Sequence, residues 1–171
     1  MKILFHHIPR TAGTSVKSWL ASCFDDQKLD LIAGHDVAHL IPSMPPDTLK
    51  ITVVREPVDR ILSAFYFHQG ADAKVSKLLH YVRHWHDTLH YQNIDLDQFD
   101  IVGIYEELPV FCDLVAQTAN LEPFDGRWLN QTAGQPRAAE VPLGIIEEMR
   151  DILVGEIAIY DRCRRTILDT P

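Results

Sequence analysis

The segment from His7 to Ser15, which reads HIPRTAGTS, combines residue types that can hold an anion. Ala12 and Gly13 are small enough to let backbone N–H groups approach a ligand closely, and Arg10 adds a fixed positive charge. Hydroxyl groups come from three further positions, Thr11, Thr14 and Ser15. A helix that begins here adds the positive end of its dipole. The segment therefore predicts a site for a phosphate or sulfate group.

The same residues also fit a plainer interpretation. In that interpretation Thr14 caps the helix and Arg10 extends into solvent. The local pattern leaves both interpretations open. It differs from the GxxxxGK[ST] loop of nucleoside triphosphatases, because the first Gly and the Lys are both missing.

A second segment, from Val53 to Phe67, reads VVREPVDRILSAFYF. Arg55 stands at the end of an expected strand, and Ser63 lies about two turns into the helix that follows. Arg55 could fold back to meet Ser63 over a common anion. Alternatively, Arg55 pairs with a carboxylate and Ser63 is a small packing residue. We expect a structural role for Arg60, which sits in mid-helix, and a helix-starting role for Glu56.

Strands and helices are expected to alternate along the chain. Apolar runs predict strands at Lys2–Ile8, Leu29–Ala33, Lys50–Val54 and Phe99–Tyr105. Helical spacing or start signals predict helices from Thr14 or Ser15, from Pro57, and over Lys74–His86, Leu108–Ala119 and Leu143–Leu168, the last interrupted near Gly155. Loops are expected over Ile41–Pro46 and Glu122–Pro142. This order predicts an α/β fold with a mostly parallel sheet, whose ligands bind at the carboxyl ends of the strands.

The composition is that of one ordinary globular domain, expected over residues 1–171. Hydrophobic residues make up 46% and charged residues 23%, and the net charge of −8 argues against a protein that coats nucleic acid or membranes. No apolar run reaches the length of a membrane helix, and no secretory signal is recognisable, so we expect a cytoplasmic protein. The three cysteines form no CxxC pair and are expected to be buried, reduced thiols: Cys23, Cys112 and Cys163.

Histidines and aromatic residues are concentrated between positions 68 and 91. Two pairs have the i, i+4 spacing that can bind zinc on a helix: His80 with His84, and His86 with His90. No HExxH motif or cysteine accompanies them, so an exposed or acceptor-facing helix is favoured and no metal is expected. Three aromatic residues could line a substrate entrance or pack in the core: Tyr81, Trp85 and Tyr91.

Taken together, HIPRTAGTS and VVREPVDRILSAFYF resemble the sulfotransferases that use 3′-phosphoadenosine 5′-phosphosulfate (PAPS), in the branch of the heparan sulfate and uronyl sulfotransferases. In that family a HIPKTGGTS-type loop cradles the 5′-phosphosulfate, which here implies residues 10–15. A second, RxPxxRxxSxxY-like motif binds the 3′-phosphate, which implies Arg55 and Ser63. The resemblance also implies a P-loop-like, three-layer fold with a central sheet flanked by helices.

Weaker likenesses extend over most of the chain. Gly34-His35 resembles a family segment whose His is a candidate catalytic base, and FDIVGIYE resembles its "VG…E" strand. The segment around Asn130 resembles a loop that contacts PAPS, and 151–160 resembles a terminal "D…Y" helix. There are also departures from the pattern: Arg10 replaces a Lys, Ala12 replaces a Gly, and the segment between Phe67 and Phe99 is short.

The resemblance implies in-line transfer of a sulfonate group from PAPS to an acceptor hydroxyl, with the 3′,5′-bisphosphate (PAP) as the product. Arg10 and the loop N–H groups would neutralise charge, and His35 would take the proton. No metal is required in this scheme. The acceptor is expected to be a carbohydrate or small metabolite, the acidic composition disfavours a highly anionic polysaccharide, and a dimer remains open.

Two other functions stay open at this point. One is a nucleotide-binding, sulfotransferase-like protein without turnover. The Arg at position 10 and the short segment between Phe67 and Phe99 favour this alternative. The other is a P-loop nucleotide kinase. The missing GK[ST] and the lack of a clear magnesium-binding Asp after a strand argue against the kinase.

Overall fold

The computed structural model describes residues 1–24, 30–85, 91, 94–129 and 137–168. The chain forms two compact units, Met1–Val54 with Asp95–Asn130, and Arg55–Ile94 with Gln131–Pro171. Each unit has its own cluster of buried apolar side chains. The first is called the sheet unit here and the second the helical unit. That the whole chain works as one domain stays a prediction.

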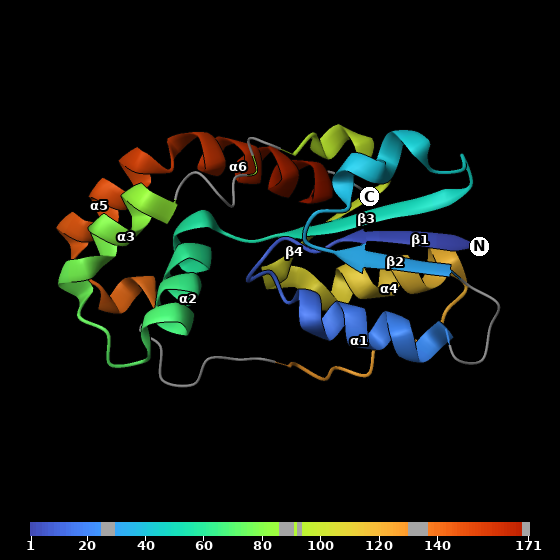
Figure 1. The fold of residues 1–171 in the computed structure, drawn as a ribbon, viewed down its shortest axis with the longest axis horizontal. Coiled ribbons are helices and arrows are strands. Elements are labelled where there is room, and N and C mark those ends of the chain that lie inside the picture. Colours follow the sequence, from blue (N-terminus) through green and yellow to red (C-terminus); the bar gives the residue numbers. More distant parts are fainter. Residues whose placement is uncertain (25–29, 86–90, 92–93, 130–136, 169–171) are drawn as a thin grey trace. The chain divides into compact units, whose positions relative to one another are not determined.

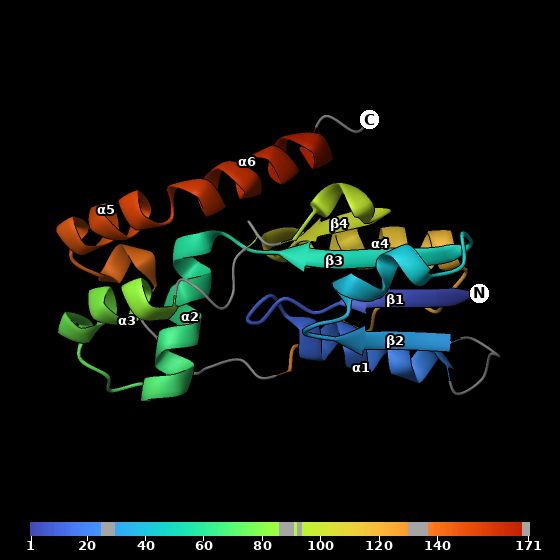
Figure 2. The same ribbon diagram turned by 45° about the horizontal axis from the view of Figure 1, so that its top comes forward.

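The sheet unit contains a four-stranded sheet with the strand order β2-β1-β3-β4 (Figure 2). Its strands are β1 (Lys2–His6), β2 (Asp30–Gly34), β3 (Thr48–Val54) and β4 (Ile101–Ile104). Every pair of neighbouring strands is parallel. The prediction of an α/β fold with a central parallel sheet flanked by helices is confirmed, and the sheet is parallel throughout.

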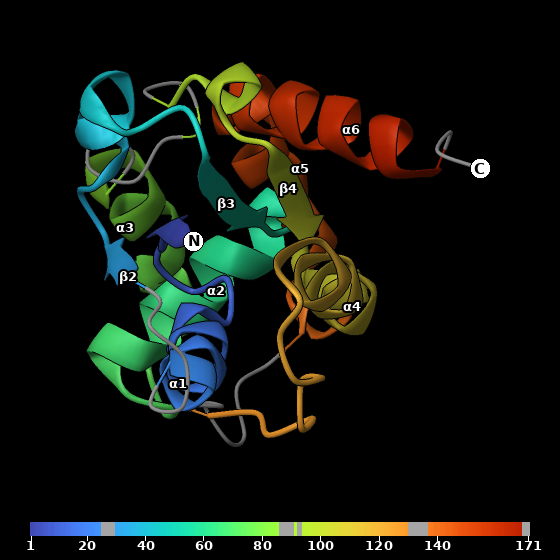
Figure 3. The same cartoon turned by 90° about the vertical axis from the view of Figure 1, so that its right-hand side faces the viewer.

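Two helices, α1 (Gly13–Phe24) and α4 (Leu108–Ala119), cover one face of this sheet (Figure 3). The apolar stripe predicted for α1 is buried there against side chains of β1 and β3. The approach of α4 depends on Gly103 in β4, because a Cβ at that position would stand 2.3 Å from the ring of Phe111. The glycine therefore lets an aromatic ring of α4 lie directly on the strand.

The chain after α4 follows α1 back toward its first turn. The Trp19 indole N–H donates to the carbonyl oxygen of Glu122 at 3.0 Å, and the ring of Trp19 meets that of Phe124 edge-on. Further along, the backbone N–H of Leu129 donates to Ser15 Oγ at 2.8 Å. Residues 121–129 have no regular secondary structure, as predicted, and these contacts tie them to α1 at both ends.

The helical unit is built from α2 (Pro57–Gln69), α3 (Leu78–Trp85), α5 (Leu143–Ile152) and α6 (Val154–Leu168) (Figure 1). Helix α2 packs against the other three. Its start is as predicted: Pro57 occupies the first turn, and the Glu56 carboxylate accepts a hydrogen bond from the backbone N–H of Asp59 at 2.7 Å.

Two boundaries differ from the prediction. The 3₁₀ helix Ala38–Ser43, which contains Pro42, extends into the loop expected over Ile41–Pro46. The helix expected from Lys74 begins with the 3₁₀ turn Val75–Lys77. The interruption predicted near Gly155 is confirmed, because α5 ends at Ile152 and α6 begins at Val154, with the buried Leu153 between them. Among the described helices, none has the length and apolar character needed to cross a membrane.

Candidate functional site

Two histidines lie side by side at the carboxyl edge of the sheet. The pairing of His6 with Gly34 places the residues that follow, His7 and His35, next to each other, and their ring centroids are 4.3 Å apart. His35 Nδ1 lies 2.7 Å from the carbonyl oxygen of His7. A carbonyl oxygen can only accept a hydrogen bond, so Nδ1 carries the proton. The neutral His35 ring then presents Nε2 as its basic atom on an exposed side chain.

The ring of His7 joins this edge to the predicted anion-binding loop. It stacks on Phe5 with an interplanar angle of 10°, and it lies directly over Gly13. A Cβ at position 13 would stand only 1.6 Å from His7 Cδ2. Position 13 therefore needs glycine because of the imidazole ring of the residue that follows β1. The sequence placed His7 in the motif but gave it no role.

His7 is a neutral side chain at neutral pH. Burial lowers the pKa of His7 to about 4, and the electrostatic effects of its neighbours His35, Lys17, His6 and Arg10 add to this shift. Burial also lowers the pKa of His6. The guanidinium of Arg10 keeps its charge at any ordinary pH. Arg10 is therefore the permanent cation of the loop itself.

The backbone of the loop alternates in handedness. Arg10 has a φ of 66° and Ala12 a φ of 63°, whereas Thr11 between them has a negative φ. Such alternation is the pattern of an anion-binding backbone nest. A non-glycine residue in the left-handed region costs about 1 kcal/mol. This explains why the related motif carries Gly where this chain has Ala12.

The first turn of α1 presents backbone donors at the end of this loop. The first hydrogen bond of the helix runs from the Val16 N–H to the Ala12 carbonyl oxygen at 3.1 Å. The N–H groups of Gly13, Thr14 and Ser15 precede it, so no carbonyl of the helix accepts them. Together with the helix dipole and Arg10, they form a partial positive site for an anion. Thr14 lies inside the first turn, so the structure does not support the alternative in which Thr14 is the N-cap.

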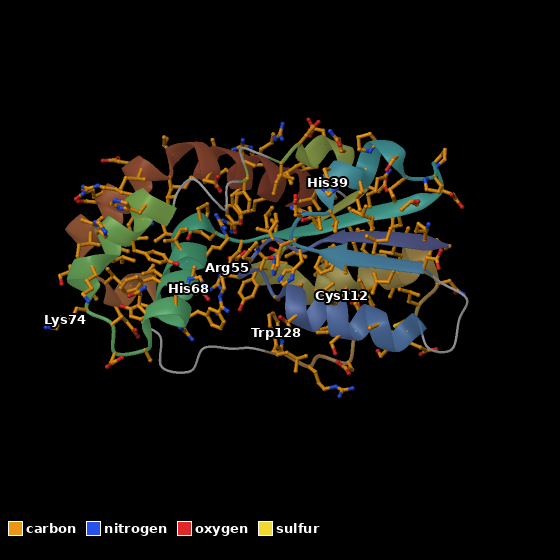
Figure 4. All side chains as sticks on the ribbon, in the orientation of Figure 1. His39, Arg55, His68, Lys74, Cys112 and Trp128 are labelled. Carbon is orange, nitrogen blue, oxygen red and sulfur yellow. The ribbon has the colours of Figure 1, made fainter. Side chains whose placement is uncertain are left out.

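Two of the predicted hydroxyl donors are used within the protein. Thr11 Oγ1 donates to the carbonyl oxygen of Ile8 at 2.7 Å, and Ser15 Oγ accepts from the N–H of Leu129. Both side chains are buried, whereas Thr14 is exposed. Thr11 therefore stabilises the turn, and Ser15 holds residues 121–129 beside it. Figure 4 shows Trp128 near the beginning of α1.

From Arg55 onward, the second segment belongs to the helical unit. Arg55 follows β3 directly in the chain and is half-buried at the start of α2 (Figure 4). The hydroxyl of Tyr91 accepts a hydrogen bond from the Arg55 N–H at 2.8 Å and donates one to the Arg55 carbonyl oxygen at 2.7 Å. Ser63, on α2, is buried. Asn130, the remaining predicted contact, lies outside the described residues.

The structural role predicted for Arg60 is confirmed. Its side chain is 1% exposed and forms an ion pair at 3.3 Å with Glu156, whose side chain is fully buried. Its guanidinium carbon lies 4.6 Å from the ring centroid of Tyr91. Tyr81 and Tyr91 are core residues rather than parts of a substrate entrance. The contacts of Arg60 and Tyr91 had no signal in the sequence, because their partners are distant along the chain.

The histidines of α3 and the cysteines are the remaining residues for which the sequence made predictions. His80 and His84 are exposed, with ring centroids 4.0 Å apart, whereas His86 and His90 fall outside the described residues. Within the part of the chain that the structure describes, no three His, Cys, Asp or Glu side chains gather as metal ligands. The cysteines are buried free thiols, as predicted. Burial raises the pKa of Cys112 to about 12, which makes its thiol a poor nucleophile.

Comparison with known proteins identifies the family. No curated protein matches the chain. Residues 1–93, just over half of the chain, match the model of the sulfotransferase family. The matched span holds the anion-binding loop, His35, Arg55 and Ser63. Because this match covers more than half of the chain, the chain belongs to the sulfotransferase family, whose general activity is sulfonate transfer.

Proposed function

We propose that this protein transfers a sulfonate group from PAPS to the hydroxyl group of an acceptor and releases PAP. The observation that carries the proposal is the segment of residues 7–15, which runs from the end of β1 into the first turn of α1. It combines a left-handed backbone at two positions, the helix N–H groups of three residues and one permanent cation. The family match supports sulfonate as the transferred group.

On the donor side, the loop would neutralise the negative charge that shifts during transfer. The N–H groups of residues 11–15 face the 5′-phosphosulfate in the proposal, and Arg10 stabilises the 5′-phosphate as its bridging oxygen departs. An Arg presents a planar fork instead of the point charge of a Lys, so it can hold two oxygens at once. Sulfonate transfer needs mainly positioning and charge neutralisation, which side chains and N–H groups can supply without a metal ion.

The 3′-phosphate is assigned to Arg55 and Ser63, with Asn130 as a further contact to PAPS. Arg55 and Ser63 lie on the helical unit, and the loop lies on the sheet unit. The proposal treats residues 1–171 as a single domain. A 3′-phosphate contact would distinguish PAPS from adenine nucleotides that lack this group.

The acceptor side is assigned to His35. Its Nδ1–H is occupied by the carbonyl oxygen of His7, so Nε2 takes the proton. The acceptor oxygen forms a bond to sulfur while the bond from sulfur to the bridging phosphate oxygen breaks. The products are a sulfate ester, PAP and a proton on His35. We propose a carbohydrate or a small metabolite as the acceptor, since a chain with a net charge of −8 repels a highly anionic polymer.

The donor assignment can be tested by calorimetry with PAP and AMP. Wild-type protein should bind PAP more tightly than AMP, and Arg55→Ala should lower PAP affinity about 10- to 100-fold while leaving AMP affinity unchanged. Arg150→Ala, which removes an exposed charge from α5, serves as the matched control and should change neither affinity. PAP binding no tighter than AMP binding in the wild type would refute the proposal.

Turnover is tested with PAPS and a panel of sugars, phenols and alcohols, by following PAP formation. His35→Ala should abolish PAP formation and preserve PAP binding. Loss of PAP binding in this variant would give His35 a structural role instead. PAP binding by the wild type without PAPS consumption across the panel would favour the alternative of a nucleotide-binding protein without turnover.

A further inference from the structure

The backbone of Arg55 lies between two regular elements. Strand β3 ends at Val54, and α2 begins at Pro57. Arg55 itself belongs to neither element, and partly buried peptide groups between elements need hydrogen-bond partners. The Tyr91 side chain is a hydrogen-bond partner of both the N–H and the carbonyl group of Arg55. Its hydroxyl accepts from the Arg55 N–H and donates to the Arg55 carbonyl oxygen.

Tyr91 is itself held by buried groups of the helical unit. Its side chain is fully buried, and the guanidinium of Arg60 lies over its ring. Arg60 is in turn paired with Glu156 on α6. A buried cation has little freedom to leave its carboxylate partner, because separation would leave two unpaired charges in an apolar interior. This series of contacts fixes the position of the Tyr91 hydroxyl.

We propose that Tyr91 is a positioning residue that holds the backbone of Arg55 so that its guanidinium is ready for the 3′-phosphate of PAPS. The inference rests on the proposed function and adds a residue to it. Two hydrogen bonds to one residue restrict its backbone angles. Binding of the phosphate therefore costs less conformational entropy at Arg55. Tyr91 contacts no substrate in this role and acts through Arg55 alone.

The test uses Tyr91→Phe in the full chain. This change keeps the ring and its contact with Arg60 and removes only the hydroxyl group. PAP affinity should fall about threefold to tenfold, whereas AMP affinity should stay the same. The matched control is Tyr81→Phe, which removes a buried hydroxyl bonded to His68 Nδ1 at 3.0 Å and should leave the ratio of the two affinities unchanged. An unchanged ratio in Tyr91→Phe overturns the inference.

A double-mutant cycle separates positioning from general loosening. In an Arg55→Ala background, Tyr91→Phe should cause no further loss of PAP affinity, because the group that it positions is gone. A loss of the same size in both backgrounds overturns the inference. If circular dichroism shows Tyr91→Phe to be unfolded, Arg60→Lys takes its place in the cycle, since it keeps the charge and removes the flat guanidinium from the Tyr91 ring.

The two proposals fail in different ways. If the wild-type protein does not prefer PAP to AMP, the proposed function fails. If the wild type prefers PAP and the Tyr91→Phe variant prefers it equally, the function stands and the positioning role of Tyr91 fails.

Discussion

Replacing Gly13 by alanine tests the packing on which the anion-binding loop depends. A Cβ at this position would lie 1.6 Å from Cδ2, 1.9 Å from Nε2 and 2.2 Å from Cγ of His7. Ordinary contacts of a Cβ begin near 3.4 Å, so the His7 ring must shift by roughly 2 Å. The ring has little room to do so, since it stacks on Phe5 and adjoins His35.

Such overpacking costs typically about 1–3 kcal/mol. Alanine in a helix recovers up to about 1 kcal/mol relative to glycine. The free energy of unfolding of Gly13→Ala should therefore fall by about 1–2 kcal/mol. PAP formation should also slow, because the displaced ring disturbs the carbonyl group to which His35 is bonded.

Urea denaturation followed by circular dichroism measures the loss of stability. Gly144→Ala, in the first turn of α5, is the matched control, because no heavy atom lies within 4 Å of its Cβ. It should be neutral or slightly stabilising. In a His7→Ala background the cost of Gly13→Ala should largely disappear. The reasoning is refuted if Gly13→Ala is as stable as the wild type, or if its cost is the same with and without the His7 ring.

Two further predictions concern buried charge. Because the pKa of His7 is lowered from 6.5 to about 4, the unfolded chain binds a proton there before the folded chain does. The free energy of unfolding should fall by about 1–2 kcal/mol between pH 7.5 and pH 5, allowing for solvent screening, and His7→Gln should flatten this slope in urea titrations across that range. Glu156→Gln leaves the buried charge of Arg60 without its carboxylate and should lower the free energy of unfolding by about 3–5 kcal/mol. A loss below 1 kcal/mol in the same urea assay would contradict the assignment of a fully buried pair.

Much of the fold was predictable because it depends on local patterns. The four strands and the helix Leu108–Ala119 were predicted at or close to their observed positions, since apolar spacing and turn residues encode them. Boundaries were less predictable: whether residues 38–43 form a loop or a 3₁₀ helix depends on weak local preferences that packing can override.

The candidate site was predictable only in part. The residues of the loop and the helix that follows it are contiguous, so their types and order indicated an anion site. The uses of Thr11 and Ser15 within the protein were not predicted, because each hydroxyl has a choice of partners that only the folded chain limits. The assignment of Arg55 and Ser63 to the 3′-phosphate of PAPS came from the family resemblance and stays a proposal.

The sequence by itself determined the α/β class and the start of α2, and it predicted an anion site at residues 7–15, because all three depend on neighbours along the chain. Tertiary structure decided the rest. The bond between His35 and the His7 carbonyl joins residues 28 positions apart, and the pair of Arg60 with Glu156 joins residues 96 positions apart. Such contacts depend on strand register and helix packing, and these exist only after the chain has buried its apolar side chains.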